Sequence, residues 1–499
     1  MKDLVFSSFS PDVISYLFEE AEISYMQGNE VTLVVCNDSI CQCPGNLSKN
    51  KSLCFLCKRF AHQMGKRIST GIKIVPVNKY ATDAMRKEVS ELTFEYQSVK
   101  DIKKLEFHHV QIGYGCLSAY ITCTRNNDPL MDDKFRAYFD DYLRTACYQT
   151  LLHEKIIERE RPDHISFFNG RTSEARSILN IAEWKKIDFT SCECLFLFPH
   201  TAAKRYFHNS IPLSITKLTE MILESWENET VPREEKTRLG KWFFESKISN
   251  RFFGDNNYTG SQDQDLLPEC WNDNKYNIVI FNSSEDELSS ISDEYDSTAL
   301  FPSQIDGIKW IAETLKHDDS TSVYLRIHPN LRNVKYKYHT DLLKIGEKYQ
   351  NFHTIPGNSK ISSYNMMLHA SVVLVFGSTI GVESAYAGKP VITLTACPYK
   401  NLGFCYIPKT IDELKILLNN HCLPPLKNEN TLKYGYFFMN HNLPGFFFFR
   451  NDKRIVKVLG REGIGFPLET LMGSMKLAVL MRLLVNRFFV KDRLPRKER

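Results

Sequence analysis

Side chains that bind phosphate and transfer protons follow three apolar segments in the second half of this 499-residue chain. One segment, typical of a buried strand, ends at Phe376 and is followed by Gly377, Ser378 and Thr379, where the pattern predicts the start of a helix. The first amides of a helix lack partners within the helix and attract anions. These hydroxyl residues therefore indicate a phosphate site, and Glu383 is placed one turn further on to accept hydroxyl groups of a ribose or sugar. The alternative is an ordinary helix start with a hydroxyl cap.

The second segment, Ser322–Ile327, contains Arg326 next to its end and is followed by His328 and Pro329. Alternate residues of a strand share a face, so Arg326 and His328 are expected on one side of the strand end. Arginine suits phosphate oxygens, and histidine can donate to a developing oxyanion or act as an acid. Both are candidate catalytic residues, although a structural histidine would also fit this pattern.

The third segment, Ile278–Phe281, is followed by short polar and acidic residues. The candidate donor-binding residues here are Asn282, Ser283, Ser284 and Glu285. Ligands of doubly wound α/β folds bind outside the carboxyl ends of the strands, so all three segments are expected to line one crevice. A solvated acidic loop that caps the next helix is the alternative for this segment alone.

The elements that must position these residues alternate along the chain. Strand, helix and strand patterns follow one another from Leu4 to Cys36 and again from Tyr276 to Asn419, which predicts two α/β domains with parallel sheets. We expect residues 1–260 to form the first domain, 271–425 the second, and 426–499 a crossing segment and tail. A polar, turn-rich stretch separates the two domains.

Composition excludes several classes of protein. The formal net charge of +4 is too small for a nucleic-acid-binding protein of this length, so no nucleic acid is expected as a partner. The first residues do not form a secretory signal, and 14 cysteines without one favour a reducing cytoplasm. No uncharged apolar run reaches the ~18 residues typical of a spanning helix.

A group of cysteines lies in the first domain, in a predicted insertion at residues 36–57. Cys41, Cys43, Cys54 and Cys57 form two close pairs. Four thiolates in two pairs predict a structural zinc site. An iron–sulfur cluster and four unrelated thiols are the alternatives. No cofactor is expected for the catalytic step.

The tail carries the basic excess of the chain. From Gly473 onward it has eight Lys and Arg residues against two acidic ones. Residues 471–490 predict an amphipathic helix with Lys476, Arg482 and Arg487 beside an apolar face. Such a helix can lie in an anionic membrane surface, which predicts a peripheral protein on the inner face of the cytoplasmic membrane. A helix that packs back on the first domain is the alternative.

The chain from Ile278 to about Leu417 resembles the C-terminal half of the capsule polysaccharide biosynthesis glycosyltransferases. These are GT-B-type enzymes related to bacterial Kdo and sialic-acid transferases. The segments that carry the resemblance are Asn282–Glu287, Arg326–Asn330, Ser362–Tyr364, Phe376–Glu383, Ala387–Pro390 and Tyr406, with Phe168–Arg171 and Tyr434–Tyr436 also fitting.

The resemblance implies two Rossmann-type domains facing a cleft. The second would bind a nucleotide-sugar donor, with its phosphate at His328, Ser378 and Thr379, and the first would bind the acceptor. Asn169 and Arg171 are then candidates to position the acceptor. Glu193 is a candidate base, with a surface carboxylate as the alternative.

The favoured hypothesis is therefore a glycosyltransferase, hexosyl or of the Kdo/sialyl type. It would move a sugar from a CMP- or NDP-sugar to a surface polysaccharide or lipid-linked glycan in bacteria. Two alternatives remain open: a nucleotide-sugar epimerase with the same fold, and a non-catalytic, membrane-docked assembly or export factor.

Overall fold

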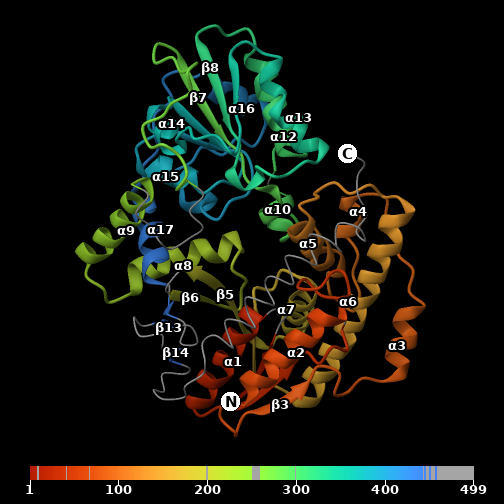
Figure 1. Ribbon diagram of the computed structural model, residues 1–499. Helices are drawn as coiled ribbons and strands as arrows, with labels where there is room; N and C mark the ends of the chain where they lie inside the picture. The colour runs from red at the N-terminus through yellow and green to blue at the C-terminus, as the bar shows by residue number, and fades with distance from the viewer. Residues whose placement is uncertain are drawn as a thin grey trace. The chain divides into compact units, whose positions relative to one another are not determined.

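The computed structural model describes residues 1–7, 11–40, 42–66, 68–197, 201–249, 259–297, 299–441, 443–444, 449–450 and 456–457. The chain divides into two compact units. Unit 1 comprises Met1–Pro212 and the described residues from Leu443 onward, and unit 2 comprises Leu213–Asn442. Both units are α/β (Figure 1).

Unit 1 is built on a seven-stranded sheet in the order β12-β6-β5-β4-β1-β2-β3. Its strands are β1 (Lys2–Phe6), β2 (Glu30–Val35), β3 (Lys73–Pro76), β4 (His164–Phe168), β5 (Asp188–Leu197), β6 (Thr201–His208) and β12 (Leu443–Pro444). Its helices are α1 (Pro11–Met26), α2 (Lys51–Gly65), α3 (Asp83–Ser90), α4 (Val99–Lys103), α5 (Ile112–Thr124), α6 (Asp133–Glu160) and α7 (Ser173–Lys185). A short pair, β13 (Phe449–Arg450) and β14 (Val456–Lys457), is antiparallel.

The first five strands of unit 1 are parallel, and β6 and β12 extend the sheet antiparallel. Because β1 pairs with both β2 and β4, the order of winding reverses between β1 and β4. One face of the sheet is covered by α1 and α2, where Leu17 and Phe18 pack with Val5 and Leu33 in a buried cluster. The opposite face receives α6, since His153 contacts Phe6 edge to face.

Unit 2 contains a five-stranded, fully parallel sheet in the order β11-β10-β7-β8-β9. Its strands are β7 (Tyr276–Phe281), β8 (Thr321–Arg326), β9 (Phe352–Ile355), β10 (Val372–Val375) and β11 (Val391–Thr393). Its helices are α8 (Ile215–Asn228), α9 (Arg233–Ile248), α10 (Glu285–Leu288), α11 (Asp293–Asp296), α12 (Gln304–Leu315), α13 (Lys337–Leu343), α14 (Ser363–His369), α15 (Ile380–Tyr386), α16 (Ile411–Leu418) and α17 (Glu429–Asn440). Short 3-10 turns lie at Pro329–Leu331, Ile345–Glu347 and Lys400–Leu402.

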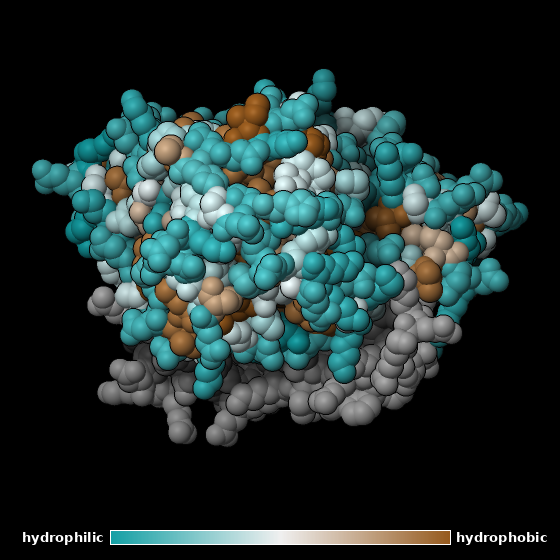
Figure 2. Space-filling view, turned by 90° about the horizontal axis from the view of Figure 1, so that it is seen from above, coloured by the Kyte–Doolittle hydropathy of each residue, from teal (hydrophilic) through white to brown (hydrophobic). Residues whose placement is uncertain are grey.

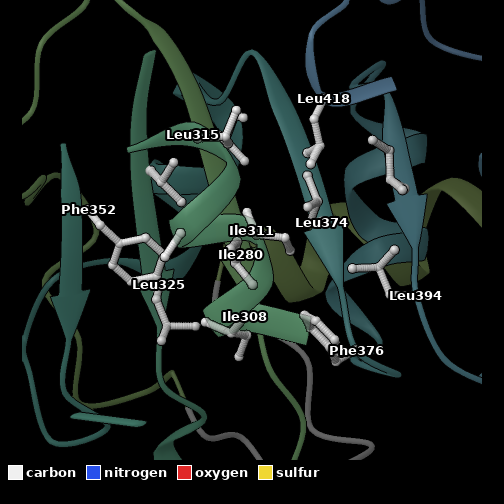
Figure 3. Close-up of a cluster of buried hydrophobic side chains, with 14 of the residues drawn as sticks. Ile280, Ile308, Ile311, Leu315, Leu325, Phe352, Leu374, Phe376, Leu394 and Leu418 are labelled. Atoms are coloured by element: carbon white, nitrogen blue, oxygen red, sulfur yellow. The ribbon is translucent and has the colours of Figure 1, made fainter. Parts of the chain in front are cut away.

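The core of unit 2 fills one face of this sheet (Figure 3). Ile308 and Ile311 of α12 pack there on Ile280 and Leu325, and Leu418 of α16 joins them. On the other side of the strands, α14 contacts β7 and α15 contacts β10 (Figure 1). Strands buried on both faces read as continuous apolar runs, which explains why the sequence predicted them.

The fold class expected from the sequence, α/β with two domains built on parallel sheets, is confirmed. The boundaries differ from the expected ones. Helices α8 and α9 belong to unit 2 rather than to the N-terminal domain, and so does α17. These helices contact one another, since α17 packs on both α8 and α9. The predicted cleft between the domains stays a prediction.

The predicted amphipathic tail, residues 471–490, lies outside the described residues. No helix in the described ranges is long and apolar enough to cross a membrane. The face seen in Figure 2 is mainly hydrophilic, and its hydrophobic residues form small separate patches. Scattered apolar side chains of this kind are normal on a protein surface.

Candidate functional site

The candidate site of unit 2 lies at the carboxyl ends of its parallel strands. Because β7 pairs with both β8 and β10, the winding order reverses between β7 and β10. Doubly wound sheets bind ligands at such a switch point. Asn282 directly follows β7, and Gly377 follows β10 after one residue, so the topology brings the first and third predicted segments to this point.

The second segment is joined to the first by a hydrogen bond. The backbone N–H of His328 donates to Asn282 Oδ1 at 2.8 Å, and Asn282 is buried. The N–H of Asn330 donates to His328 Nδ1 at 3.2 Å. Since Nδ1 accepts, the neutral imidazole carries its proton on Nε2 and is a donor there.

Asn330 makes a further connection with its side chain. Its Nδ2 donates to Ser284 Oγ at 3.2 Å and to Glu287 Oε1 at 2.8 Å. Ser284 Oγ in turn donates to the carboxylate of Asp286. The polar segment after β7 is therefore held against the segment after β8.

Gln304, at the start of α12, anchors the same segment from the other side. The N–H of Ser283 donates to Gln304 Oε1 at 2.9 Å, and Gln304 Nε2 donates to Ser283 Oγ at 3.1 Å. Glu285 Oε1 accepts the N–H of Gln304 at 3.1 Å. Ser283 and Glu285 thus shape the loop, in line with the capping role that the sequence left open.

Arg326 is buried at the end of β8 and binds backbone and hydroxyl oxygens. Its Nε donates to Ser363 Oγ at 3.1 Å, Nη2 donates to Ser359 O at 3.3 Å, and Nη1 donates to Pro356 O. Burial lowers the pKa of Arg326 to about 10, so the guanidinium stays charged at neutral pH. These contacts place Arg326 as an anchor of the loop between β9 and α14, and its predicted phosphate role stays a prediction.

The turn after β10 packs against the same region. Gly377 has a φ of +82°, and a Cβ there would lie 2.4 Å from Leu288 Cδ1. The positive φ favours glycine at this turn, which packs against α10, the helix that contains Glu285. The carbonyl of Ser378 accepts a hydrogen bond from the Tyr399 hydroxyl.

Glu383, predicted to bind ribose or sugar hydroxyls, is buried in α15. Its Oε1 lies 3.4 Å from the ammonium group of Lys247 in α9. Thr379 occupies the N-cap of α15 without a side-chain cap bond. The structure thus brings Gly377, Ser378 and Thr379 to the switch point, while Glu383 is paired within the unit.

The candidates of unit 1 lie after β4 and on β5. Asn169 adopts a positive φ of 59° and donates through Nδ2 to Glu193 Oε2. Glu193 pairs in register with Arg205 of β6. Arg171 Nε donates to Ser118 Oγ in α5 at 2.7 Å. Asn169 and Glu193 are therefore in direct contact, and Arg171 is directed to α5.

Three of the predicted zinc ligands are described, and Cys41 lies outside the described residues. Cys54 and Cys57 are on α2, and Cys54 Sγ accepts from Asn46 Nδ2 at 3.2 Å. Among the described residues no group of three His, Cys, Asp or Glu side chains has a geometry that could hold a metal ion. The structural zinc stays a prediction that metal analysis of the purified chain can check.

Comparison with known proteins identifies no family. No family model matches the chain, and no curated protein matches it. Solved structures do resemble it. KpsC from Thermosulfurimonas dismutans, as beta Kdo 2,4 transferase, is 12% identical with a TM-score of 0.36, over 56% of this chain and 83% of that chain. The beta Kdo 2,7 transferase of the same protein is 16% identical with a TM-score of 0.34, over 57% and 79%.

UDP-GlcNAc 2-epimerase from Neisseria meningitidis, bound to UDP-GlcNAc, is 13% identical with a TM-score of 0.28, over 97% of this chain and 100% of that chain. Transferases and epimerases thus stand side by side among the similar structures. At these TM-scores they do not decide between the two activities, and the fold described above rests on the sheets of this chain.

Several residues of the site were missed by the sequence analysis. Gln304 and Lys247 act through contacts with partners 21 or more positions away, and nothing in their local pattern signals this. An Asp-x-Asp triplet, Asp263 and Asp265, was also overlooked. Both carboxylates are exposed, and carboxylates at this spacing can bind a divalent cation. The expected absence of a catalytic metal therefore stays untested.

Proposed function

We propose that the chain is a glycosyltransferase that binds a nucleotide-activated sugar at the switch point of unit 2. The observation that carries the proposal is the network in which Asn282 and Ser284 after β7 bond to His328 and Asn330 after β8. It positions His328 at the edge where an open α/β sheet binds nucleotides.

In this proposal His328 donates from Nε2 to an oxygen of the donor phosphate. The bond between the sugar anomeric carbon and the phosphate oxygen breaks as negative charge develops on that oxygen. A fixed N–H donor stabilises this charge without reorganisation. The amides and hydroxyls of Ser378 and Thr379 would serve the same oxygens. Arg326 adds a buried positive charge beneath this edge of the sheet.

Unit 1 would bind the acceptor. An acceptor hydroxyl forms the new bond to the anomeric carbon and loses its proton to a base. Glu193 is the candidate base, and its contact with Asn169 supports a joint role in orienting that hydroxyl. The acceptor we propose is a surface polysaccharide or a lipid-linked glycan, with the basic tail at an anionic membrane surface.

Nucleotide binding tests the proposal first. Purified wild type, His328→Ala and the exposed control His317→Ala are melted with CMP, CDP, UDP and GDP, because a ligand bound only by the folded state raises the melting midpoint. We expect one nucleotide to stabilise wild type and the control but not His328→Ala. Equal stabilisation of all three proteins, or of none, would contradict a nucleotide site at His328.

Turnover then separates transferase from epimerase and from an assembly factor. A transferase releases nucleotide in step with glycan growth and needs an acceptor. An epimerase converts its nucleotide-sugar without acceptor, and an assembly factor does neither. Product analysis with and without a glycan acceptor therefore distinguishes the three hypotheses.

A further inference from the structure

A cavity of about 50 Å³ lies in unit 1, outside the site described above. Ser7, Cys36 and Val77 line it, and they directly follow β1, β2 and β3. The opposite wall comes from α6 and from Glu174 near the start of α7, which follows β4. The cavity thus lies at the carboxyl edge of the sheet, beside the β1–β4 switch point, where this fold class binds ligands.

Two buried side-chain oxygens in this wall lack hydrogen-bond partners. They are Glu174 Oε1 and Gln149 Oε1. Glu174 is 8% exposed and Gln149 is 1% exposed. A buried polar atom without a hydrogen bond costs about 1–3 kcal/mol, so these atoms indicate an occupant that forms hydrogen bonds.

Hydrogen bonds hold two of the polar residues that line the cavity. Glu174 Oε2 accepts from Ser173 Oγ at 3.2 Å, and Ser173 Oγ lies 3.0 Å from the Tyr142 hydroxyl. His153, which also lines the cavity, holds Ser177 Oγ at 2.6 Å through Nδ1. The carboxyl of Glu174 and the imidazole of His153 are therefore preorganised.

The cavity favours a neutral occupant. Burial raises the pKa of Glu174 to about 8 and lowers the pKa of His153 to about 3, so both groups favour their uncharged forms near neutral pH. The cavity volume exceeds the ~10–15 Å³ that one water needs, so the cavity has room for a small polar group such as a hydroxymethyl arm.

We propose that this cavity receives the hydroxymethyl arm of a neutral hexose, whose hydroxyl donates to Gln149 Oε1 and accepts from the protonated carboxyl of Glu174. Phe6, Val34 and Ile178 supply apolar contacts for its methylene group. The inference rests on the proposed function, because it names the acceptor as a glycan with unoxidised hexose units. It predicts that uronic acids and 6-deoxy sugars are rejected, since the first carries a charge and the second leaves Glu174 and Gln149 without hydrogen-bond partners.

Ligand-observed NMR on the full chain tests this with matched probes. Methyl glucoside, galactoside and mannoside are compared with methyl 6-deoxyglucoside and methyl glucuronide. We expect at least one of the three hexosides to bind wild type, with tenfold or greater weakening for the two altered sugars. Glu174→Leu and Gln149→Leu should weaken hexoside binding about tenfold. Glu183→Gln, an exposed carboxylate of the same helix, should leave it unchanged.

Equal binding of the hexosides and the altered sugars would overturn the proposal. So would unchanged hexoside binding in both leucine variants, or no hexoside binding to folded wild type. A far-ultraviolet circular dichroism spectrum and a melting profile like those of wild type show that each variant is folded in both units. If nucleotide binding at His328 holds while the hexosides fail, the cavity proposal falls and the proposed transferase stands.

Discussion

Asn282 accepts the backbone N–H of His328 at 2.8 Å across 46 positions of sequence. The bond joins the residue after β7 to the residue that leads from β8 into its 3-10 turn. This bond fixes the position of the His328 backbone at the sheet edge. The bond from the Asn330 N–H to Nδ1 orients the imidazole. The candidate phosphate donor is thus positioned by a neighbouring strand.

Replacing Asn282 tests this positioning. Asn282→Ala leaves the half-buried N–H of His328 without its acceptor, which costs about 1 kcal/mol of stability. We expect nucleotide affinity to fall about tenfold, measured by titration calorimetry. Asn282→Asp keeps an acceptor oxygen and should preserve most of the stability. Nucleotide affinity equal to wild type in the alanine variant would show that this bond does not position the site.

We predict that the hydrogen bonds of Arg326 contribute to the stability of unit 2. In Arg326→Lys a single ammonium cannot replace the guanidinium donors to Ser363, Ser359 and Pro356. We expect a loss of about 2–4 kcal/mol, measured by urea titration of the wild type and the variant. Arg332→Lys, at an exposed position, is the control and should change stability by less than about 0.5 kcal/mol.

Glu174 predicts a pH dependence of stability. Its pKa in the fold, about 8, exceeds the ordinary 4.5, so the folded state binds this proton more tightly than the unfolded state. The free energy of unfolding therefore falls as pH rises from about 4.5 to about 8, by at most ~1.4 kcal/mol per pH unit. The side chain of Glu174→Gln does not titrate, so the variant does not lose this stability. The difference in free energy of unfolding between variant and wild type, measured by urea titration, should therefore grow from pH 5 to pH 8. A constant difference across this range would contradict the raised pKa, and Glu183→Gln serves as the control.

The tail prediction is tested with lipid vesicles. The double variant Arg482→Glu/Arg487→Glu changes the charge of the predicted amphipathic helix by four units. Each basic residue near an anionic surface contributes about 1 kcal/mol, so sedimentation with phosphatidylserine vesicles should fall at least tenfold. Neutral phosphatidylcholine vesicles are the comparison. Equal sedimentation of wild type and variant with anionic vesicles would remove the membrane role.

The strands of unit 2 were predictable because their burial on both faces demands continuous apolar residues. The run predicted at Val372–Phe376 is observed as β10, Val372–Val375, and the run at Ile278–Phe281 lies within β7, Tyr276–Phe281. The polar residues after these strands were predictable for the same reason, since Asn282 and Gly377 interrupt an apolar pattern. Local composition carries this information, so the candidate segments could be found without a structure.

The partners of those residues were decided by the tertiary structure. The strand order β11-β10-β7-β8-β9 sets which loops meet, and no local pattern encodes that order. Arg326 meets the carbonyls of the loop after β9 because β9 lies next to β8 in this order. Helix packing likewise pairs Glu383 with Lys247 and places α8 and α9 in unit 2. The cavity beside Glu174 likewise arises from strands and helices more than 100 positions apart. Residue types and spacing determine which chemistry is available, whereas long-range packing decides which side chains remain to perform it.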